Sequence, residues 1–244
     1  MKLELELKVP VSMASIKLGD YQKYSKIVKQ AEKDEESDDF IKLKMLEIFC
    51  GLELKDSYKL PLSVFEGAIN QTVQCLNEQT PLLKNFHMTD QEGGNAVEFG
   101  FIPKLDDMSF GEYVDLDSTI SDIDTLHRAM AVLYRPIVEK KKDAYRIKDY
   151  EGYHDYADLM KDMPLNVALG ALVFFYRLGI KLYKYTTDSL LKQLETSPQQ
   201  RLDLEKKLLE QNGVGTSLYT RLLEETSSSL MRLPSSHFEN ASLG

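Results

Sequence analysis

The sequence predicts a mainly α-helical protein, a multi-helix bundle with a long central helix and one or two small β-hairpins. Apolar side chains recur at spacings of three and four residues along most of the chain, which is the period of a helix packed on one side. Over residues 164–194 this pattern barely breaks and predicts one helix of about 30 residues. Strict alternation of apolar and polar residues, typical of strands, is confined to short stretches.

The first 80 residues predict one hairpin and three helices. Residues 3–9 alternate leucine or valine with charged residues, which favours a strand, and residues 15–18 are its expected partner. A helix should open at Gly19 and end in the acidic run 34–39. Residues 40–49 predict a second helix. Gly51 should close the second helix, and a capping box of Ser63 and Glu66 should begin a third helix.

A second hairpin is predicted where residues 82–88 and 97–102 flank a polar segment with two glycines. Downstream, Ser109 stands three residues before Glu112, the spacing of a capping box, so we expect a helix to begin near Phe110. Asp122 offers a second cap for a helix with an apolar stripe.

That helix should end at Tyr134 or Arg135, because Pro136 removes a backbone donor and favours extended geometry before it, so we expect a turn there. A short amphipathic helix is predicted over residues 150–160, and Pro164 suits the first turn of the long helix. Two further helices are expected between residues 197 and 230.

With 244 residues the chain can build one large or two modest domains. We expect an N-terminal α+β region over residues 1–103 with hairpins and three helices, and a central helical core over residues 104–195. A C-terminal helical pair should follow over residues 196–233, and a flexible tail over residues 234–244.

The formal net charge of −9 argues against a general nucleic-acid binder, since such proteins need clustered cations. One basic group, which also contains Glu139 and Asp143, departs from this balance, and we interpret it as a solvated loop or a contact for an acidic protein face, with a phosphate contact as the alternative. Its cations are Arg135, Lys140, Lys141, Lys142, Arg146 and Lys148.

Composition and the chain start favour an intracellular protein with no membrane contact. Cys50 and Cys75 fall at the ends of helical stripes, where a thiol acts as a small apolar filler, so we expect a reducing compartment. Residues 1–10 lack the pattern of a signal peptide. The longest apolar run, residues 167–176, is about half of what a spanning helix requires.

The sequence predicts no catalytic residue, cofactor or metal. Asp115, Asp117, Asp122 and Asp124 suggest calcium, but an EF-hand loop beginning at Asp115 would place Ile120 and Leu126 where glycine and glutamate are required. Nucleophile, phosphate-loop and dinucleotide motifs are lacking. An enzyme hypothesis would first test the residues with titratable or cationic side chains near the basic group, namely Arg146, Glu151, His154 and Asp155.

Aromatic residues around the expected helix at Phe110 suit either a core or a partner groove, since capped amphipathic helices with tyrosines at their rim also build interfaces. Together with the cations, they are our interface candidates. The full set is Phe110, Tyr113, Tyr134, Arg135, Lys140, Lys141, Lys142 and Arg146.

Three motifs follow the leucine-alternating start: LGDYQKY at residues 18–24, FIPKLDDMSFGEY at residues 101–113, and LYRPI at residues 133–137. Over residues 1–185 the chain resembles a group of small proteins of tailed bacteriophages, including crAss-like and related phages. The resemblance implies a non-enzymatic, oligomeric or ring-forming protein that contacts other phage structural proteins, located in the virion and, during assembly, in the host cytoplasm.

Under that resemblance two roles compete: a virion component of ring or cargo type near the portal and tail, or an assembly chaperone that is not retained in the particle. A third reading is a DNA-contacting factor of packaging or ejection, which would use residues 140–148.

Overall fold

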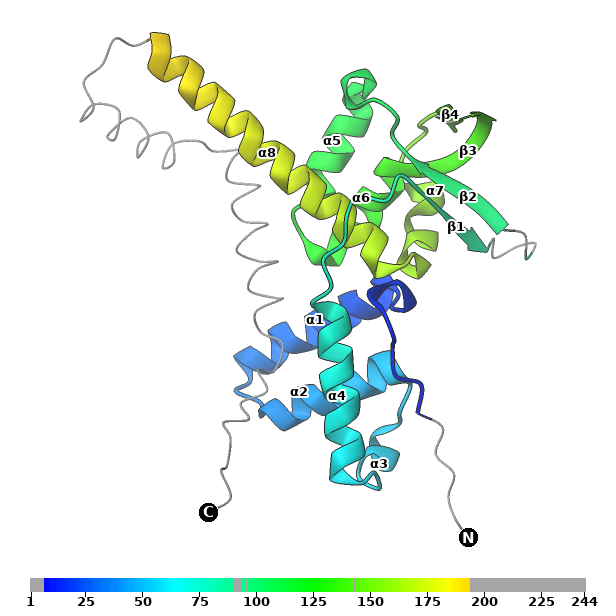
Figure 1. The fold of residues 1–244 in the computed structure, drawn as a ribbon, viewed down its shortest axis with the longest axis vertical. Coiled ribbons are helices and arrows are strands. Elements are labelled where there is room, and N and C mark those ends of the chain that lie inside the picture. Colours follow the sequence, from blue (N-terminus) through cyan, green and yellow to red (C-terminus); the bar gives the residue numbers. More distant parts are fainter. Residues whose placement is uncertain (1–6, 90–93, 95, 143, 194–244) are drawn as a thin grey trace.

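The computed structural model describes residues 7–89, 94, 96–142 and 144–193. Helices dominate, and a small four-stranded antiparallel sheet accompanies them, which confirms the coarse prediction of a mainly α protein with minor β structure. Figure 1 shows two groups of elements: the helices within residues 18–76 (α1 to α4) gather at one end, while the sheet and the helices within residues 110–157 (α5 to α7) lie at the other. Helix α8 (Leu165–Gln193) begins between the two groups and contacts α1 and α6.

The N-terminal group consists of helices whose caps are local. Ser37 accepts a hydrogen bond from the backbone N–H of Phe40 and so starts the second helix, which ends at Gly51 in the left-handed conformation with φ of 66°. The predicted cap at Gly51 is therefore confirmed. The elements are η1 (Met13–Ser15), α1 (Leu18–Lys33), α2 (Asp38–Cys50), α3 (Leu54–Ser57) and α4 (Leu62–Leu76).

The predicted strand over residues 15–18 is wrong. Ser15 ends a 3-10 helix, and the extended segment at Lys17 pairs with Pro164 instead. The backbone N–H of Leu18 donates to Met163 and that of Leu165 donates to Ile16, at 2.9 and 2.8 Å. Residues 1–6, the other half of the predicted hairpin, lie outside the described residues.

The predicted Ser63/Glu66 capping box is also wrong. Helix α4 begins at Leu62 after Pro61, with no side-chain cap, so Ser63 already lies inside the first turn. Pro61 sets the entry into the helix by its fixed φ. By contrast, both cysteines are buried near helix ends and free, as predicted: Cys50 closes α2 and Cys75 lies in the last turn of α4.

The predicted hairpin at residues 82–102 is confirmed, and it is part of a larger sheet with strand order β1-β2-β3-β4. Its strands are β1 (Asn85–Thr89), β2 (Ala96–Phe101), β3 (Tyr134–Lys141) and β4 (Ala144–Ile147), each antiparallel to its neighbour. Phe99 pairs with Pro136 and Phe101 with Tyr134, so β2 and β3 join across the predicted boundary at residue 103. The four predicted segments stay a prediction.

The expected turn at Pro136 is wrong. Helix α6 (Leu126–Leu133) ends as expected, but the chain continues directly as strand β3 with Pro136 inside it. Proline is tolerated because its carbonyl still accepts the backbone N–H of Lys148 at 2.9 Å, and only the reciprocal bond is lost. The basic group at residues 135–148 is therefore a β-hairpin rather than a loop.

The remaining helices divide more finely than predicted. Residues 123–133 form a 3-10 turn and then α6, and the single helix expected over residues 150–160 is two short ones. The elements are η2 (Leu105–Asp107), α5 (Phe110–Thr119), η3 (Ile123–Thr125), α7 (His154–Ala157) and η4 (Leu159–Asp162).

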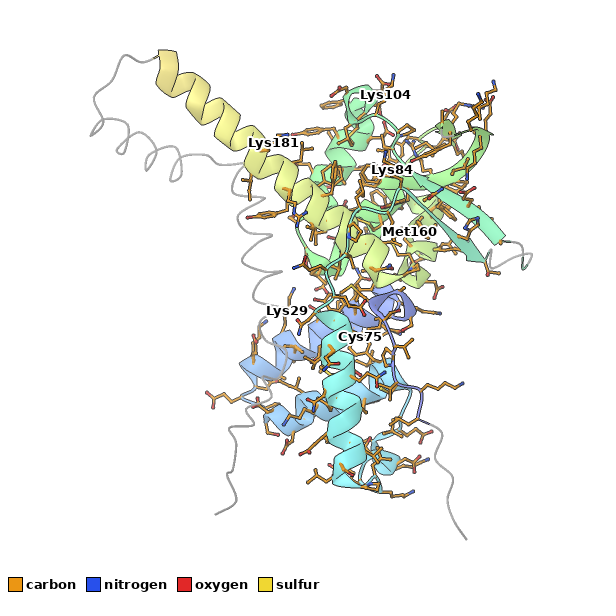
Figure 2. All side chains as sticks on the ribbon, viewed as in Figure 1. Lys29, Cys75, Lys84, Lys104, Met160 and Lys181 are labelled. Atoms are coloured by element: carbon orange, nitrogen blue, oxygen red, sulfur yellow. The ribbon has the colours of Figure 1, made fainter. Side chains whose placement is uncertain are left out.

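Helix α8 spans Leu165–Gln193. Its first half is buried at residues such as Leu165, Ala168 and Leu172, and Gly170 lies so close to the chain at Pro81 that a Cβ there would overlap the proline carbonyl. Figure 2 shows Met160, which is fully buried, between the α1–α4 group and the sheet group. No helix among the described residues is long and apolar enough to cross a membrane. The predicted C-terminal helices and tail lie outside the described residues.

Candidate functional site

Helix α5 begins with the predicted capping box. The Ser109 hydroxyl accepts the backbone N–H of Glu112 at 3.3 Å, and the Glu112 carboxylate accepts the backbone N–H of Ser109 at 2.7 Å. Two backbone donors that would otherwise lack partners are thereby satisfied, so the first turn of the helix has a fixed direction.

One face of α5 contacts strand β3 and the segment that follows the sheet. The second carboxylate oxygen of Glu112 pairs with the Arg135 guanidinium at the beginning of β3, and both side chains are buried. One turn further, Asp115 accepts the Tyr150 hydroxyl at 2.5 Å, and the Tyr150 ring lies 5.3 Å from the guanidinium of Arg135. Leu116 complements these contacts as a buried apolar anchor. Burial and the bond to Asp115 raise the pKa of Tyr150 above its usual value, so its hydroxyl remains a donor.

The opposite face of α5 exposes three apolar side chains in its first half. Phe110, Tyr113 and Val114 are 81%, 55% and 44% exposed, and their spacing of three and four residues puts them on one side of the helix. We call these three residues the α5 face. Exposed aromatic groups on an ordered helix are typical of contact surfaces, because such side chains bind with little loss of conformational freedom. Two of the interface candidates, Phe110 and Tyr113, thus lie at the surface, and Val114 is an addition that the stripe pattern did not single out.

Two other candidates, Tyr134 and Arg135, are core residues. Tyr134 is 0% exposed, and its hydroxyl donates to the Leu83 carbonyl at 2.7 Å while its ring packs against Phe86 and Phe101. Arg135 is held in the ion pair with Glu112. Neither side chain is available to a partner. Arg135 positions α5 against the sheet, whereas Tyr134 packs among the aromatic rings of the core.

The other four candidates are exposed on the β3–β4 hairpin, which we call the basic hairpin: Lys140, Lys141, Lys142 and Arg146. Acidic side chains accompany them. Lys140 lies 2.6 Å from Glu98, and Glu139 contacts both Lys141 at 3.0 Å and Arg146 at 3.8 Å. The positive charge of the hairpin is therefore partly balanced within the molecule.

The residues of the enzyme hypothesis do not converge on one point. Lys148 lies 4.0 Å from both Glu151 and Asp155, while the His154 ring packs against its neighbour Tyr153 at 4.2 Å. Arg146 contacts Glu139 instead. In the described part of the chain, no three histidine, cysteine, aspartate or glutamate side chains gather in a way that could hold a metal ion.

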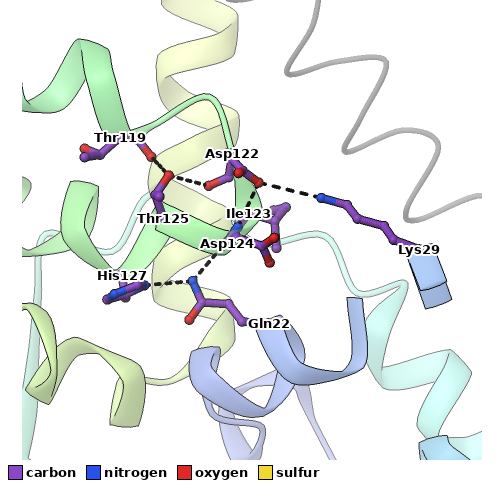
Figure 3. Close-up of polar contacts among 8 residues, drawn as sticks. All are labelled: Gln22, Lys29, Thr119, Asp122, Ile123, Asp124, Thr125 and His127. Carbon is purple, nitrogen blue, oxygen red and sulfur yellow. Dashed lines mark hydrogen bonds and ion pairs between the residues drawn. The ribbon is translucent and has the colours of Figure 1, made fainter. Parts of the chain in front are cut away.

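A buried polar cluster joins the two groups of elements (Figure 3). The Gln22 amide on α1 donates to the Ile123 carbonyl at 2.6 Å and meets Nδ1 of His127 at 3.0 Å. Because a carbonyl can only accept, the amide nitrogen must face Ile123, and its second N–H then requires an unprotonated Nδ1 on His127. Beside it, Lys29 pairs with Asp122 at 3.6 Å.

A second exposed apolar region lies at the far end of the α1–α4 group. It escaped the sequence prediction, although the run YKLPLSV over residues 58–64 departs from helical spacing. Its exposed members are Leu54, Tyr58, Leu62 and Val64.

Comparisons of the chain with models of protein families, with curated proteins and with solved structures give no match.

Proposed function

We propose that this protein acts without catalysis, as a structural or assembly component of a tailed-bacteriophage particle that binds other phage proteins through the α5 face. The observation that carries the proposal is the contrast between the two sides of α5. Its inner side is anchored by a capping box and a buried ion pair, and its outer side exposes Phe110, Tyr113 and Val114.

This arrangement favours docking because the helix is ordered before any partner arrives. Covering an exposed aromatic side chain is worth about 1.5–3 kcal/mol, and a rigid mount lowers the ordering cost that a loop would incur. The motif resemblance, which includes the capping-box serine and the aromatic pair Phe110 and Tyr113, supports the assignment to phage particles.

We also propose that α8 is the central helix of a multi-helix bundle and that copies assemble as a ring near the portal or tail. Burial of Leu165, Ala168 and Leu172 in the first half of α8 supports the bundle. A ring would present the α5 face of each copy in the same orientation.

A DNA-contacting role is less well supported. Lys140 is matched by Glu98, and Lys141 and Arg146 by Glu139, so few phosphate contacts would release counterions. Binding to duplex DNA that falls steeply with salt would reverse this order of preference.

The test is quantitative mass spectrometry of purified particles. A virion component is retained at a fixed copy number per particle, whereas an assembly chaperone is absent from particles and co-purifies with unassembled subunits. Absence from both fractions contradicts the proposal.

A further inference from the structure

The sheet has two edges, and they differ in how they are protected. β4, at one edge, follows a register shift between Ile137 and Glu139, bears the exposed Arg146, and adjoins the basic hairpin turn, where Lys142 has φ of 52°. Bulges and charges of this kind prevent an edge strand from pairing with another chain.

The opposite edge, β1, has neither a register shift nor a lysine, arginine or acidic side chain. Its sequence NFHMT has no lysine, arginine, acid or proline, and it pairs with β2 at five successive positions without a shift. Figure 1 shows β1 and β4 at the two ends of the sheet. Among the described residues, β2 is the only strand that pairs with β1.

The ladder fixes which groups of β1 face outward. The backbone N–H of Phe101 donates to the Lys84 carbonyl at 2.7 Å, so Lys84 and Phe101 form a hydrogen-bonded pair. Because such pairs alternate in an antiparallel ladder, Phe86 and Met88 bond to β2. The backbone N–H and C=O groups of the intervening residues therefore point away from the sheet, and these residues are Asn85, His87 and Thr89.

We propose that β1 is a pairing edge for a second copy of this chain, with the two β1 strands joined antiparallel about a two-fold axis at His87. In this register His87 faces His87 of the second copy, and Asn85 faces Thr89 of the second copy. Every outward N–H and C=O group of these residues then gains a partner.

The side chains of β1 are self-complementary in the same register. Phe86 and Met88, both 8% exposed, lie on the buried face of the sheet, and each would meet the other type across the axis in a close non-hydrogen-bonded pair. Asn85, His87 and Thr89 occupy the opposite face. Across the two-fold axis, none of the facing pairs of β1 residues contains a lysine, an arginine or an acidic residue. A five-residue strand is short, so we expect a reversible, concentration-dependent dimer.

This inference concerns a different surface from the α5 face and does not rest on the proposed function. A dimer through β1 also gives a two-fold contact, whereas contacts that close a larger ring must come from other surfaces.

A charge exchange at His87 tests the pairing. The side chain is exposed, so His87→Lys and His87→Glu should each fold, as circular dichroism will show. Light scattering over a concentration series should find the wild type dimeric and each variant alone monomeric, since like charges would face each other. An equimolar mixture should recover dimers. A monomeric wild type, or single variants that still dimerise, overturns the proposal.

A cysteine pair tests the register. A mixture of Asn85→Cys and Thr89→Cys chains should form an intermolecular disulfide on mild oxidation, because the facing Cα atoms would be about 5.5 Å apart. Asn85→Cys alone is the control: its two cysteines would lie at opposite ends of the paired strands, about 13 Å apart, and should not cross-link. Equal cross-linking in both samples excludes the two-fold register.

Discussion

Glu112 and Arg135 form a buried ion pair that joins the first turn of helix α5 to the beginning of strand β3, and the same carboxylate completes the capping box with Ser109. One side chain thus fixes both the start of the helix and its position on the sheet. The exposed α5 face depends on this pair for its orientation.

Replacing Arg135 with methionine should therefore destabilise the fold by about 3 kcal/mol, because the Glu112 carboxylate would stay buried without its partner. Urea denaturation followed by circular dichroism measures the loss. The double variant Arg135→Met/Glu112→Gln should recover most of it, since no charge is then buried. A single-variant loss below about 1 kcal/mol contradicts a structural role for the pair.

Acid should weaken the contact between Gln22 and His127. Burial, with the charges of Lys161 and Arg128, lowers the pKa of His127 from 6.5 to about 4, so the unfolded chain binds the proton more readily than the folded one. Stability should fall by about 1–3 kcal/mol as the pH drops from 6.5 to 4, because over this range His127 of the unfolded chain binds a proton while the buried imidazole of the folded chain does not.

His127→Leu should flatten this pH dependence, and His154→Gln, at an exposed histidine, should leave it unchanged. Thermal melts across this pH range supply the measurement. An unaltered slope in His127→Leu would remove this histidine as the cause.

Two glycines in helices should respond oppositely to alanine. Gly170→Ala should destabilise the protein by about 1–3 kcal/mol, because its Cβ would overlap the Pro81 carbonyl. Gly67→Ala in α4, where a Cβ meets no described atom within 4 Å, should stabilise it by about 0.5–1 kcal/mol. The change in denaturant midpoint of each variant relative to the wild type is the measurement. Changes of the same sign in both variants would refute the packing of α8 on the segment at Pro81.

Features set by neighbouring residues could be predicted from the sequence. The Ser109/Glu112 capping box and the glycine after α2 are local, so spacing alone reveals them. Ser63 and Glu66 show the same spacing without forming a cap, because Pro61 starts α4 earlier. Spacing indicates a cap but does not fix its position.

Features set by distant residues could not be predicted. Nothing near Pro136 reveals that β3 pairs with β2, whose Phe99 is far away in the sequence. Arg135 belongs to a basic run that is typical of surface cations, yet its partner Glu112 comes from helix α5 and makes burial possible. The side of α5 that stays exposed follows from these same contacts.

The most direct test of the proposed docking surface is site-specific photocross-linking in cells that assemble particles. A benzophenone amino acid replaces Tyr113 on the α5 face or, as the control, Val11, which is 77% exposed and precedes η1. The account predicts that the probe at position 113 forms a discrete adduct with another phage structural protein and that the probe at position 11 does not. Adducts of equal yield at both positions, or none at position 113, would contradict it.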